Sequence, residues 1–499
     1  MQLKIYNTLS RQKELFVPLM EDPKYHGPKK TTVGLYSCGP TVYRDPHIGN
    51  MRAYLCRDIL CNTLEKIMGY PLRNVMNMTD VGHLTSDADE GEDKMEKGAK
   101  RDNMTVWELA DKYIASFKRY LKLLNIDEYE IICRATEHIQ EQITMIQQLE
   151  KKGYTYIIPD DGVYMDTSKI KDYGYLAKLD IAGLQQGARI ENENKKNKTD
   201  FGLRKFSPVN EHRQMEWDSP WGKGFPGRHI ECSAMATKYL GEQFDIHTGG
   251  VDHISVHHVN EIAQSECALG THPRVKYWMH NQFLNLGGKK QSKSEGGLVT
   301  VDELIKKGFH PLDFRYLCMT AHYRSFLEFN EDLLQTAKNS RNNLIKKMQK
   351  LFDQHAKIII DFDSMPYEQI KETITSKYVG DALEDIMNAL MDDLNMPQVL
   401  AIINQSLNSL DKVEEVDMND LFVALHWLEK NLLKIGLFDR IGQEVKEIKI
   451  PAKIQKLAEQ RLEAKQAKDY ARSDELRKEI LELGREVKDT KEGYELMKM

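Results

Sequence analysis

The stretch CGPTVYRDPHIGN, residues 38–50, separates two segments with different hydrophobic patterns. Residues 32–36 (TVGLY) alternate apolar with small or polar side chains, as a strand does. From about Gly49 the apolar residues recur at helical spacing until Gly69, a helix stop signal. Residues 72–79 (LRNVMNMT) then resemble a second strand. A strand, a glycine-containing loop, a helix and a strand open a nucleotide-binding βαβ unit. The stretch therefore predicts a Rossmann-like α/β fold.

The overall composition is that of a globular protein with several domains. The chain has 499 residues, of which 41% are hydrophobic and 29% charged. Its seven cysteines have no regular short spacing, which argues against a disulfide framework and favours a reducing compartment. The first residues lack the apolar core of a signal peptide, and no window has the length of a membrane span. We therefore expect a cytoplasmic protein that contacts no membrane.

The net charge of −6 argues against a nucleic-acid-binding protein that relies on an overall positive charge. A local basic surface can still bind phosphate groups, because the attraction depends on nearby charges.

The remaining sequence divides into segments of different composition. Residues 85–104 are densely charged and predict a solvated insertion, whereas residues 105–151 look helical. Residues 185–215 contain ENENKKNKTD and predict an exposed loop within a small inserted region. Glycine, histidine and tryptophan return over 225–300, where we expect the second half of the nucleotide-binding fold. Residues 330–440 have the pattern of amphipathic helices in a bundle.

A tail follows from Pro451, in which Leu476, Ile480 and Leu483 form a helical stripe that Gly484 would end. Together with the resemblance given below, these segments lead us to expect five parts. They are residues 1–130, the first half of the catalytic domain; 131–224, an inserted connective region; 225–329, the second half; 330–450, a helical bundle; and 451–499, a C-terminal domain.

Two segments have features that suit the binding of phosphate groups. His47 directly precedes the predicted helix, whose end offers unpaired N–H groups and partial positive charge. The loop GGKKQSKSEGG, residues 287–297, places Lys289, Lys290 and Lys293 between glycines. Mobile lysines of this kind can close over a triphosphate and neutralise developing charge. The alternative for both segments is an ordinary solvated loop.

Together the two segments resemble the signature pair of class I aminoacyl-tRNA synthetases. Residues 47–50 (HIGN) correspond to the HIGH element, and residues 290–294 (KQSKS) correspond to the KMSKS element. Within that class the chain is similar to the cysteinyl-tRNA synthetases. The stretches that carry this similarity run nearly from end to end: LYSCGPTVY (35–43), FPGRHIECSAM (225–235), HHVNEIAQS (257–265), YWMHNQ (277–282), AHYRSFLEF (321–329), MDDLNMP (391–397) and QRLEAKQAKDYARSDELR (460–477).

The resemblance implies one zinc ion in the active site, held at the motif positions Cys38, Cys232, His257 and Glu261. Thiolate, imidazole and carboxylate are ordinary zinc ligands, and residues 257 and 261 share one face of a predicted helix. Without the resemblance, both cysteines would be interpreted as ordinary buried cysteines. His258 stays outside the predicted metal set. The other cysteines are expected to pack, two on the helix after His47 and three in helical contexts: Cys56, Cys61, Cys133, Cys267 and Cys318.

The implied reaction is the ATP-dependent ligation of L-cysteine to its tRNA through a cysteinyl-adenylate, with the zinc binding the substrate thiolate and Mg²⁺ accompanying ATP. The implied fold is a Rossmann-like catalytic domain with an inserted small domain, followed by a helical bundle and a small C-terminal anticodon-binding domain. We expect a monomer. The residues implied to act on the reacting phosphate are His47, Asn50, Lys290 and Lys293. Those implied to line the nucleotide site are Gly39, Thr41, His47, Gly49, Asp252 and Lys293.

Four positions depart from the family pattern: Asn50, Thr248, Gln291 and Arg228, the last where the family usually has Trp. Two alternative functions stay open. One, suggested by the departures at Gln291 and Arg228, is a catalytically inactive paralogue that binds RNA. The other is a related ligase that joins cysteine to an amino-sugar, although such ligases lack the anticodon-binding tail found here.

Overall fold

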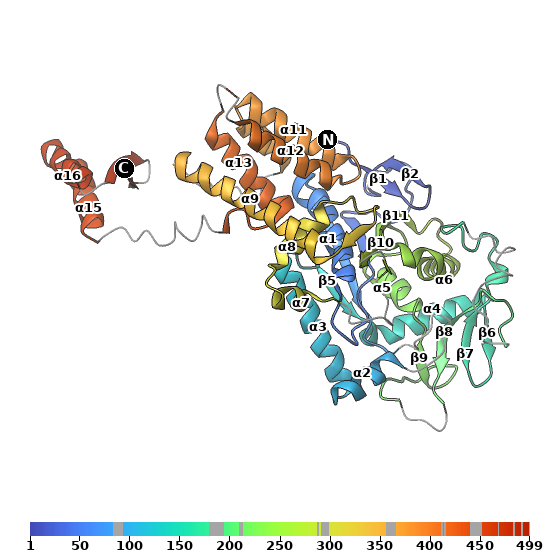
Figure 1. The fold of residues 1–499 in the computed structure, drawn as a ribbon. Coiled ribbons are helices and arrows are strands. Elements are labelled where there is room, and N and C mark those ends of the chain that lie inside the picture. The colour runs from blue at the N-terminus through green and yellow to red at the C-terminus, as the bar shows by residue number, and fades with distance from the viewer. Residues whose placement is uncertain are drawn as a thin grey trace. The chain divides into compact units, whose positions relative to one another are not determined.

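The computed structural model describes most of the chain (Figure 1). The described residues are 1–82, 93–178, 194–208, 213–286, 289–290, 299–355, 366–410, 413, 416–439, 452–467, 469–482, 485–490 and 493–498. Internal contacts divide the chain into two units, Met1–Leu437 and Phe438–Met499.

A five-stranded sheet organises the first unit, with strand order β11-β10-β3-β4-β5 and every pair parallel. Its strands are β3 (Val33–Ser37), β4 (Leu72–Met78), β5 (Ile131–Arg134), β10 (Phe244–Gly250) and β11 (Val275–Asn281). Strand β3 is buried along its whole length, as expected for a central strand of a parallel sheet. The predicted βαβ unit is confirmed, because α1 (Ile48–Asn62) and a π-helical turn (Thr63–Ile67) connect β3 to β4.

Helices α4 (Ile139–Lys151), α5 (Ile230–Leu240) and α6 (Val259–Leu269) pack together, and α5 also packs against β3 and β4. A separate antiparallel sheet of β6 (Thr155–Ile158), β7 (Gly162–Met165), β8 (Phe201–Phe206) and β9 (Gly224–Pro226) is inserted before α5. In Figure 1 this inserted sheet lies at the opposite end of the unit from helices α9 to α13. The parallel sheet is therefore built from two chain segments on either side of an insertion.

Two smaller sheets complete the first unit. β1 (Lys4–Asn7) pairs with β2 (Gln12–Leu15). β12 (Leu284–Leu286) pairs with both β13 (Lys289–Lys290) and β14 (Leu327–Phe329).

The prediction for residues 85–151 is wrong in two places. Residues 93–102 are not a solvated insertion, since Asp93 caps helix α2 (Lys94–Asp102), which buries Met95 and Ala99; residues 83–92 lie outside the described residues. Residues 105–151 are not all helical, because β5 lies between α3 (Val106–Leu123) and α4. Cys133 accordingly lies on a strand rather than in a helical context. A four-residue strand is too short to show a period of its own.

The predicted boundary at residue 131 falls at the first residue of β5, a strand of the parallel sheet. The division into five domains remains a prediction. The exposed loop predicted for 185–215 lies partly outside the described residues, although 201–206 form strand β8.

Helices fill the rest of the first unit, as predicted for 330–440 within the described residues. They are α7 (Val301–Lys306), α8 (Pro311–Met319), α9 (Glu331–His355), α10 (Tyr367–Thr373), α11 (Lys377–Met391), α12 (Met396–Ser409) and α13 (Met418–Leu428), followed by a π-helical turn, Glu429–Leu433.

The second unit contains α15 (Ala452–Gln466), α16 (Tyr470–Glu482) and a hairpin of β15 (Arg485–Thr490) and β16 (Gly493–Lys498). Leu476 and Ile480 are buried on α16, as the predicted stripe requires; Leu483 and Gly484 lie outside the described residues. Across the described part of both units, we find no helix long and apolar enough to cross a membrane.

Candidate active site and metal-binding cluster

The loop after β3 is held against the end of β4. The backbone N–H of Gly39 donates to Asn77 Oδ1 at 2.9 Å, and Thr41 forms a β-bridge with Thr79. A Cβ on Gly39 would lie 1.6 Å from the carbonyl oxygen of Asn77, so only glycine fits here. This close approach fixes the position of the neighbouring Cys38.

We expect Gly39→Ala to lower the thermal unfolding midpoint clearly, since an overpacked core position typically costs about 1–3 kcal/mol. The variant should also bind divalent metal more weakly, because Cys38 must move with the loop. Gly380→Ala is the matched control: the Cβ would meet only Ile374 at 3.9 Å, and alanine favours the helix. If both variants unfolded at the wild-type temperature, the loop would not depend on the Gly39 contact.

Helix α1 begins with a reciprocal cap. His47 is the N-cap residue, and its Nδ1 accepts from the backbone N–H of Asn50 at 3.3 Å. Asn50 Oδ1 in turn accepts from the backbone N–H of His47 at 3.3 Å. The departure from HIGH to HIGN therefore keeps a side chain that fixes the start of α1. Gly49 lies in the first turn of this helix.

The first signature segment pairs with the chain just after the lysine loop. The N–H of Ile48 donates to the carbonyl oxygen of Val299 at 2.9 Å, and His47 forms an antiparallel bridge with Thr300. At the other end of the lysine loop, Lys290 pairs with Asn285 in the sheet. Residues 291–298, including Gln291 and Lys293, lie outside the described residues, as do the side chains of residues 289 and 290.

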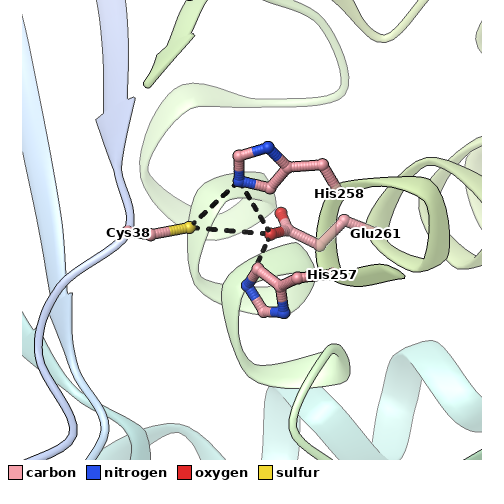
Figure 2. Close-up of side chains that lie close together, drawn as sticks. All are labelled: Cys38, His257, His258 and Glu261. Carbon is pink, nitrogen blue, oxygen red and sulfur yellow. Dashed lines mark hydrogen bonds and ion pairs between the residues drawn. The ribbon is translucent and has the colours of Figure 1, made fainter. Parts of the chain in front are cut away.

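A cluster of possible metal ligands is formed by Cys38, His257, His258 and Glu261 (Figure 2). One ligand atom from each lies within 4.8 Å of all the others. Cys38 Sγ lies 3.4 Å from His258 Nε2 and 3.8 Å from Glu261 Oε1, and His257 Nε2 lies 2.9 Å from the same Oε1. The structure thus brings three predicted metal residues together and adds His258.

Two consecutive histidines reach the cluster because of the local helix geometry. Residues 254–258 form a π-helical turn that continues directly into α6. Such turns change the direction of side chains within a helix and are frequent at functional sites. On a regular α-helix, residues four apart share a face, so the sequence pairs His257 with Glu261 and gives no reason to include His258.

Cys232, the fourth predicted metal residue, lies in the first turn of α5 and is 2% exposed. It lines the same small cavity as Cys38 and His257. The interaction with Cys38 outweighs burial and lowers the pKa of Cys232 to about 7. Cys232 therefore lies near the cluster, although it is not among the four residues whose ligand atoms come together.

The histidines of the cluster are held by outer partners. His257 Nδ1 lies 2.7 Å from His229 Nδ1. His258 Nδ1 lies 2.7 Å from His280 Nε2, and His280 Nδ1 lies 2.7 Å from Thr8 Oγ1. Partners of this kind orient imidazoles that bind metals, because they leave the other ring nitrogen facing the ion.

The carboxylate of Glu261 is ionised within the cluster. Its Oε2 lies 3.0 Å from His247 Nε2. Burial raises the pKa of Glu261, but the histidines at 247 and 257 outweigh this and hold it well below its ordinary value. Burial lowers the pKa of His257, yet Glu261 and Cys232 together raise it to about 10. The donor types of this buried set, thiol, imidazole and carboxylate, fit a divalent cation that prefers sulfur and nitrogen.

A cavity of about 90 Å³ adjoins the cluster. Cys38, Cys232 and His257 line one part of it, while Thr41 and Arg228 are also among its lining residues. Arg228, one of the four departures named above, therefore lies in the wall of this small pocket. The cavity is suited to a small polar molecule rather than to a bulky one.

The end of β10 supplies the other side of the site. Thr248 Oγ1 donates to Ser37 Oγ of β3 at 2.9 Å. The side chain of Thr248, one of the four departures from the family pattern, is therefore hydrogen-bonded to the neighbouring strand. Gly249 has no room for a Cβ, which would lie 2.6 Å from the ring of His258. Asp252 follows in a short 3₁₀ turn. These residues lie at the carboxyl ends of parallel strands, where α/β folds bind ligands.

Comparison with known proteins places the catalytic part of the chain in one family. Residues 25–339 match the family described as tRNA synthetases class I (C) catalytic domain. The chain is similar to cysteine–tRNA ligase 1 of Burkholderia lata, at 43% identity over 100% of this chain and 97% of that protein. It is also similar to the cysteine–tRNA ligase of Treponema denticola, at 41% identity over 97% of each chain.

Among solved structures, the chain resembles Mycobacterium tuberculosis methionyl-tRNA synthetase in complex with methionyl-adenylate. The TM-score is 0.54 at 13% identity, over 82% of this chain and 91% of that chain. At this identity the likeness concerns the fold alone, and it agrees with the parallel sheet and its insertion. The identity to curated relatives extends over essentially the whole chain, and the chain therefore belongs to the cysteine–tRNA ligase family of class I tRNA synthetases.

Proposed function

We propose that this protein ligates L-cysteine to its tRNA at the expense of ATP, through a cysteinyl-adenylate. The observation that carries the proposal is the position of one loop, residues 38–47. At its start, Cys38 belongs to the thiol–imidazole–carboxylate cluster and lines the small cavity. At its end, His47 caps α1 and pairs with Thr300, just after the lysine loop. An amino acid in the cavity would lie against both the cluster and this loop.

Cys38, Cys232, His257 and Glu261 would hold one zinc ion. When bound, the zinc ion would prefer the thiolate of the substrate to a hydroxyl, since sulfur is the softer ligand. The protein residues orient this site through the partners His229 and His247. A hydrophobic pocket alone separates near-isosteres such as cysteine and serine only about ten- to a few-hundred-fold.

His47, Lys290 and Lys293 would stabilise charge on the α-phosphate as the carboxylate of cysteine attacks it and pyrophosphate leaves, with Mg²⁺ accompanying ATP. Asn50 would act by fixing His47 at the start of α1. Phosphoryl-type chemistry of this kind depends on positioning and charge rather than on covalent groups of the protein. We place Gly39, Thr41, Gly49 and Asp252 around the nucleotide. Since the cluster uses residues of one chain only, we propose that a monomer is active.

Of the alternatives, the amino-sugar ligase is disfavoured by the C-terminal tail, which contains two helices and a hairpin. The inactive paralogue is disfavoured at two of the four departures. The side chains of Asn50 and Thr248 form hydrogen bonds that hold the start of α1 and the end of β10 in place.

The proposed function is tested by cysteine-dependent exchange of labelled pyrophosphate into ATP. We expect exchange with cysteine in zinc-loaded enzyme, and exchange with serine weaker by several orders of magnitude. Charging of tRNA with labelled cysteine should follow in the same preparation. The absence of cysteine-dependent exchange would favour the inactive paralogue, and exchange without tRNA charging would favour the amino-sugar ligase.

Deletion of residues 451–499 should affect transfer to tRNA much more than formation of the cysteinyl-adenylate. We expect cysteine-dependent pyrophosphate exchange to stay within about twofold of wild type, because the tail supplies no residue of the cluster or of the signature segments. Transfer to tRNA should fall, mainly through a raised KM for tRNA, as expected when contacts that serve binding rather than chemistry are removed. A truncated enzyme that charged tRNA like the full chain would contradict an anticodon-binding role.

A further inference from the structure

Arg52 is a buried cation that is bound by backbone carbonyl groups. It lies on α1, the helix that His47 caps, and it is 0% exposed. Within the described part of the chain, none of its hydrogen bonds goes to a carboxylate. Burying a charged side chain without a paired counter-ion is costly, and the cost is offset only by well-placed hydrogen bonds. The contacts of Arg52 therefore indicate what it is there to hold.

The guanidinium of Arg52 joins two segments that are far from it in the sequence. Nη1 donates to the carbonyl oxygens of Gln282 and Phe283, at 2.9 and 2.6 Å. Nη2 donates to the carbonyl oxygens of His322 and Ser325, at 3.2 and 2.6 Å. The rigid, planar fork of arginine donates in fixed directions, which the single ammonium of lysine cannot do. Arg52 therefore fastens both segments to α1.

The two segments lead into strands of the small sheet beside the lysine loop (residues 287–297). β12 begins directly after Phe283, β14 begins shortly after Ser325, and the two strands pair in parallel. β12 also pairs with β13, where Asn285 lies opposite Lys290. The chain thus enters the lysine loop through a strand whose preceding residues are bound by Arg52.

The chain that leaves the lysine loop is attached to the start of the same helix. The carbonyl oxygen of Val299 accepts from the N–H of Ile48, and Thr300 pairs with His47. The described residues on both sides of the loop are therefore tied to α1, on one side at the first turn of the helix and on the other through Arg52.

The segment of residues 322–325 is also fixed on its other side. The hydroxyl of Tyr323 donates to Asp393 Oδ1 at 2.6 Å, and Nε of Arg324 donates to Asp393 Oδ2 at 2.7 Å. Asp393 is buried and lies between α11 and α12. Arg52 therefore binds a segment that is itself anchored to the helical bundle.

We propose that Arg52 is a positioning residue for formation of the cysteinyl-adenylate, because it holds β12 at a fixed place relative to His47. It acts through the backbone and does not contact the substrate. A displacement of about 1 Å, caused far from the chemistry, can slow a reaction about a hundredfold. Loss of the fork should therefore slow the chemical step. Cysteine should still bind, because Arg52 is not among the residues that line the cavity beside the metal-binding cluster.

This inference rests on the function proposed above, and it is tested with full-length Arg52→Lys. Lysine keeps the charge and much of the side-chain volume, so the protein should fold, but its point charge cannot replace the fork. We expect single-turnover formation of the adenylate to be about tenfold to a hundredfold slower than in wild type. The KM values for cysteine and ATP in pyrophosphate exchange should stay within about twofold, since binding contacts are kept.

Arg315→Lys is the matched control. Arg315 is buried and also donates to four backbone carbonyl oxygens, those of residues 124, 125, 432 and 433, and it pairs with Asp58. None of these contacts leads into the lysine loop. The control should lose stability, as Arg52→Lys does, and form the adenylate at the wild-type rate.

Amide hydrogen exchange provides a second readout that does not depend on activity. In Arg52→Lys, exchange should become faster in β12 and β14 and stay near wild type in β3 and β10, because the lost hydrogen bonds are local. A uniform increase would assign Arg52 to overall stability and overturn the proposal.

A wild-type rate of adenylate formation in Arg52→Lys would overturn the role of Arg52 alone. Equal slowing in Arg52→Lys and Arg315→Lys would overturn it too, since any buried arginine would then have the same effect. Wild-type protein that forms no adenylate would overturn the proposed function itself.

Discussion

Replacing Lys293 with alanine should slow cysteinyl-adenylate formation by about a hundredfold or more. Removing one preorganised donor to a developing charge typically costs about 3 kcal/mol in the transition state. Cysteine binding should change little, because the charge of Lys293 matters most when the α-phosphate becomes pentavalent. The measurement is single-turnover formation of the adenylate, beside equilibrium binding of cysteine.

Lys307→Ala provides the control for this result. Lys307 forms an exposed ion pair with Glu331, and such pairs contribute little to stability. Its adenylate formation should match wild type. A Lys293→Ala enzyme that lost cysteine affinity and kept its chemical rate would contradict the role proposed for Lys293.

Cys232→Ser should weaken zinc binding by more than about a hundredfold, because it removes a ligand, whereas the loss of an outer partner costs about 10–100-fold. His258→Gln should cost about tenfold or less, since we place His258 beside the metal rather than among its ligands. Both variants are measured by Zn²⁺ competition in the full-length protein. The comparison matters because His258 Nε2 lies 3.4 Å from Cys38 Sγ and its position alone would also suit a ligand.

If His258→Gln weakened zinc binding more than Cys232→Ser did, the ligands assigned to the metal would have to be revised. If His258→Gln lost zinc and Cys232→Ser kept it, the metal would be held by the cluster of Cys38, His257, His258 and Glu261.

The central part of the fold could be predicted from the sequence because the hydrophobic period changes sharply around residues 38–50. An alternating segment, a loop and a helical segment are distinct patterns, and they became β3, the loop and α1. Strand β5 was missed, because four residues between two long helices carry no period of their own. Helix α2 was missed because its sequence is mostly charged, while Met95 and Ala99 provide its buried face.

The metal residues could be identified only in part from local patterns. His257 and Glu261 are related by helical spacing, but Cys38 and Cys232 lie far apart in the chain and line the same cavity only because α5 packs against β3. Those two were found through the family resemblance alone. The contribution of His258 depends on a π-helical turn, which a sequence pattern does not report.

The measurement that tests the central claim most directly is X-ray absorption at the zinc edge, on full-length protein with and without substrate. The claim is that the site at Cys38, Cys232, His257 and Glu261 holds a zinc ion that binds the thiolate of cysteine. We predict two sulfur neighbours around zinc in the free protein and one more after cysteine is added, with no change after serine is added. A zinc environment that stays the same when cysteine binds would contradict the claim.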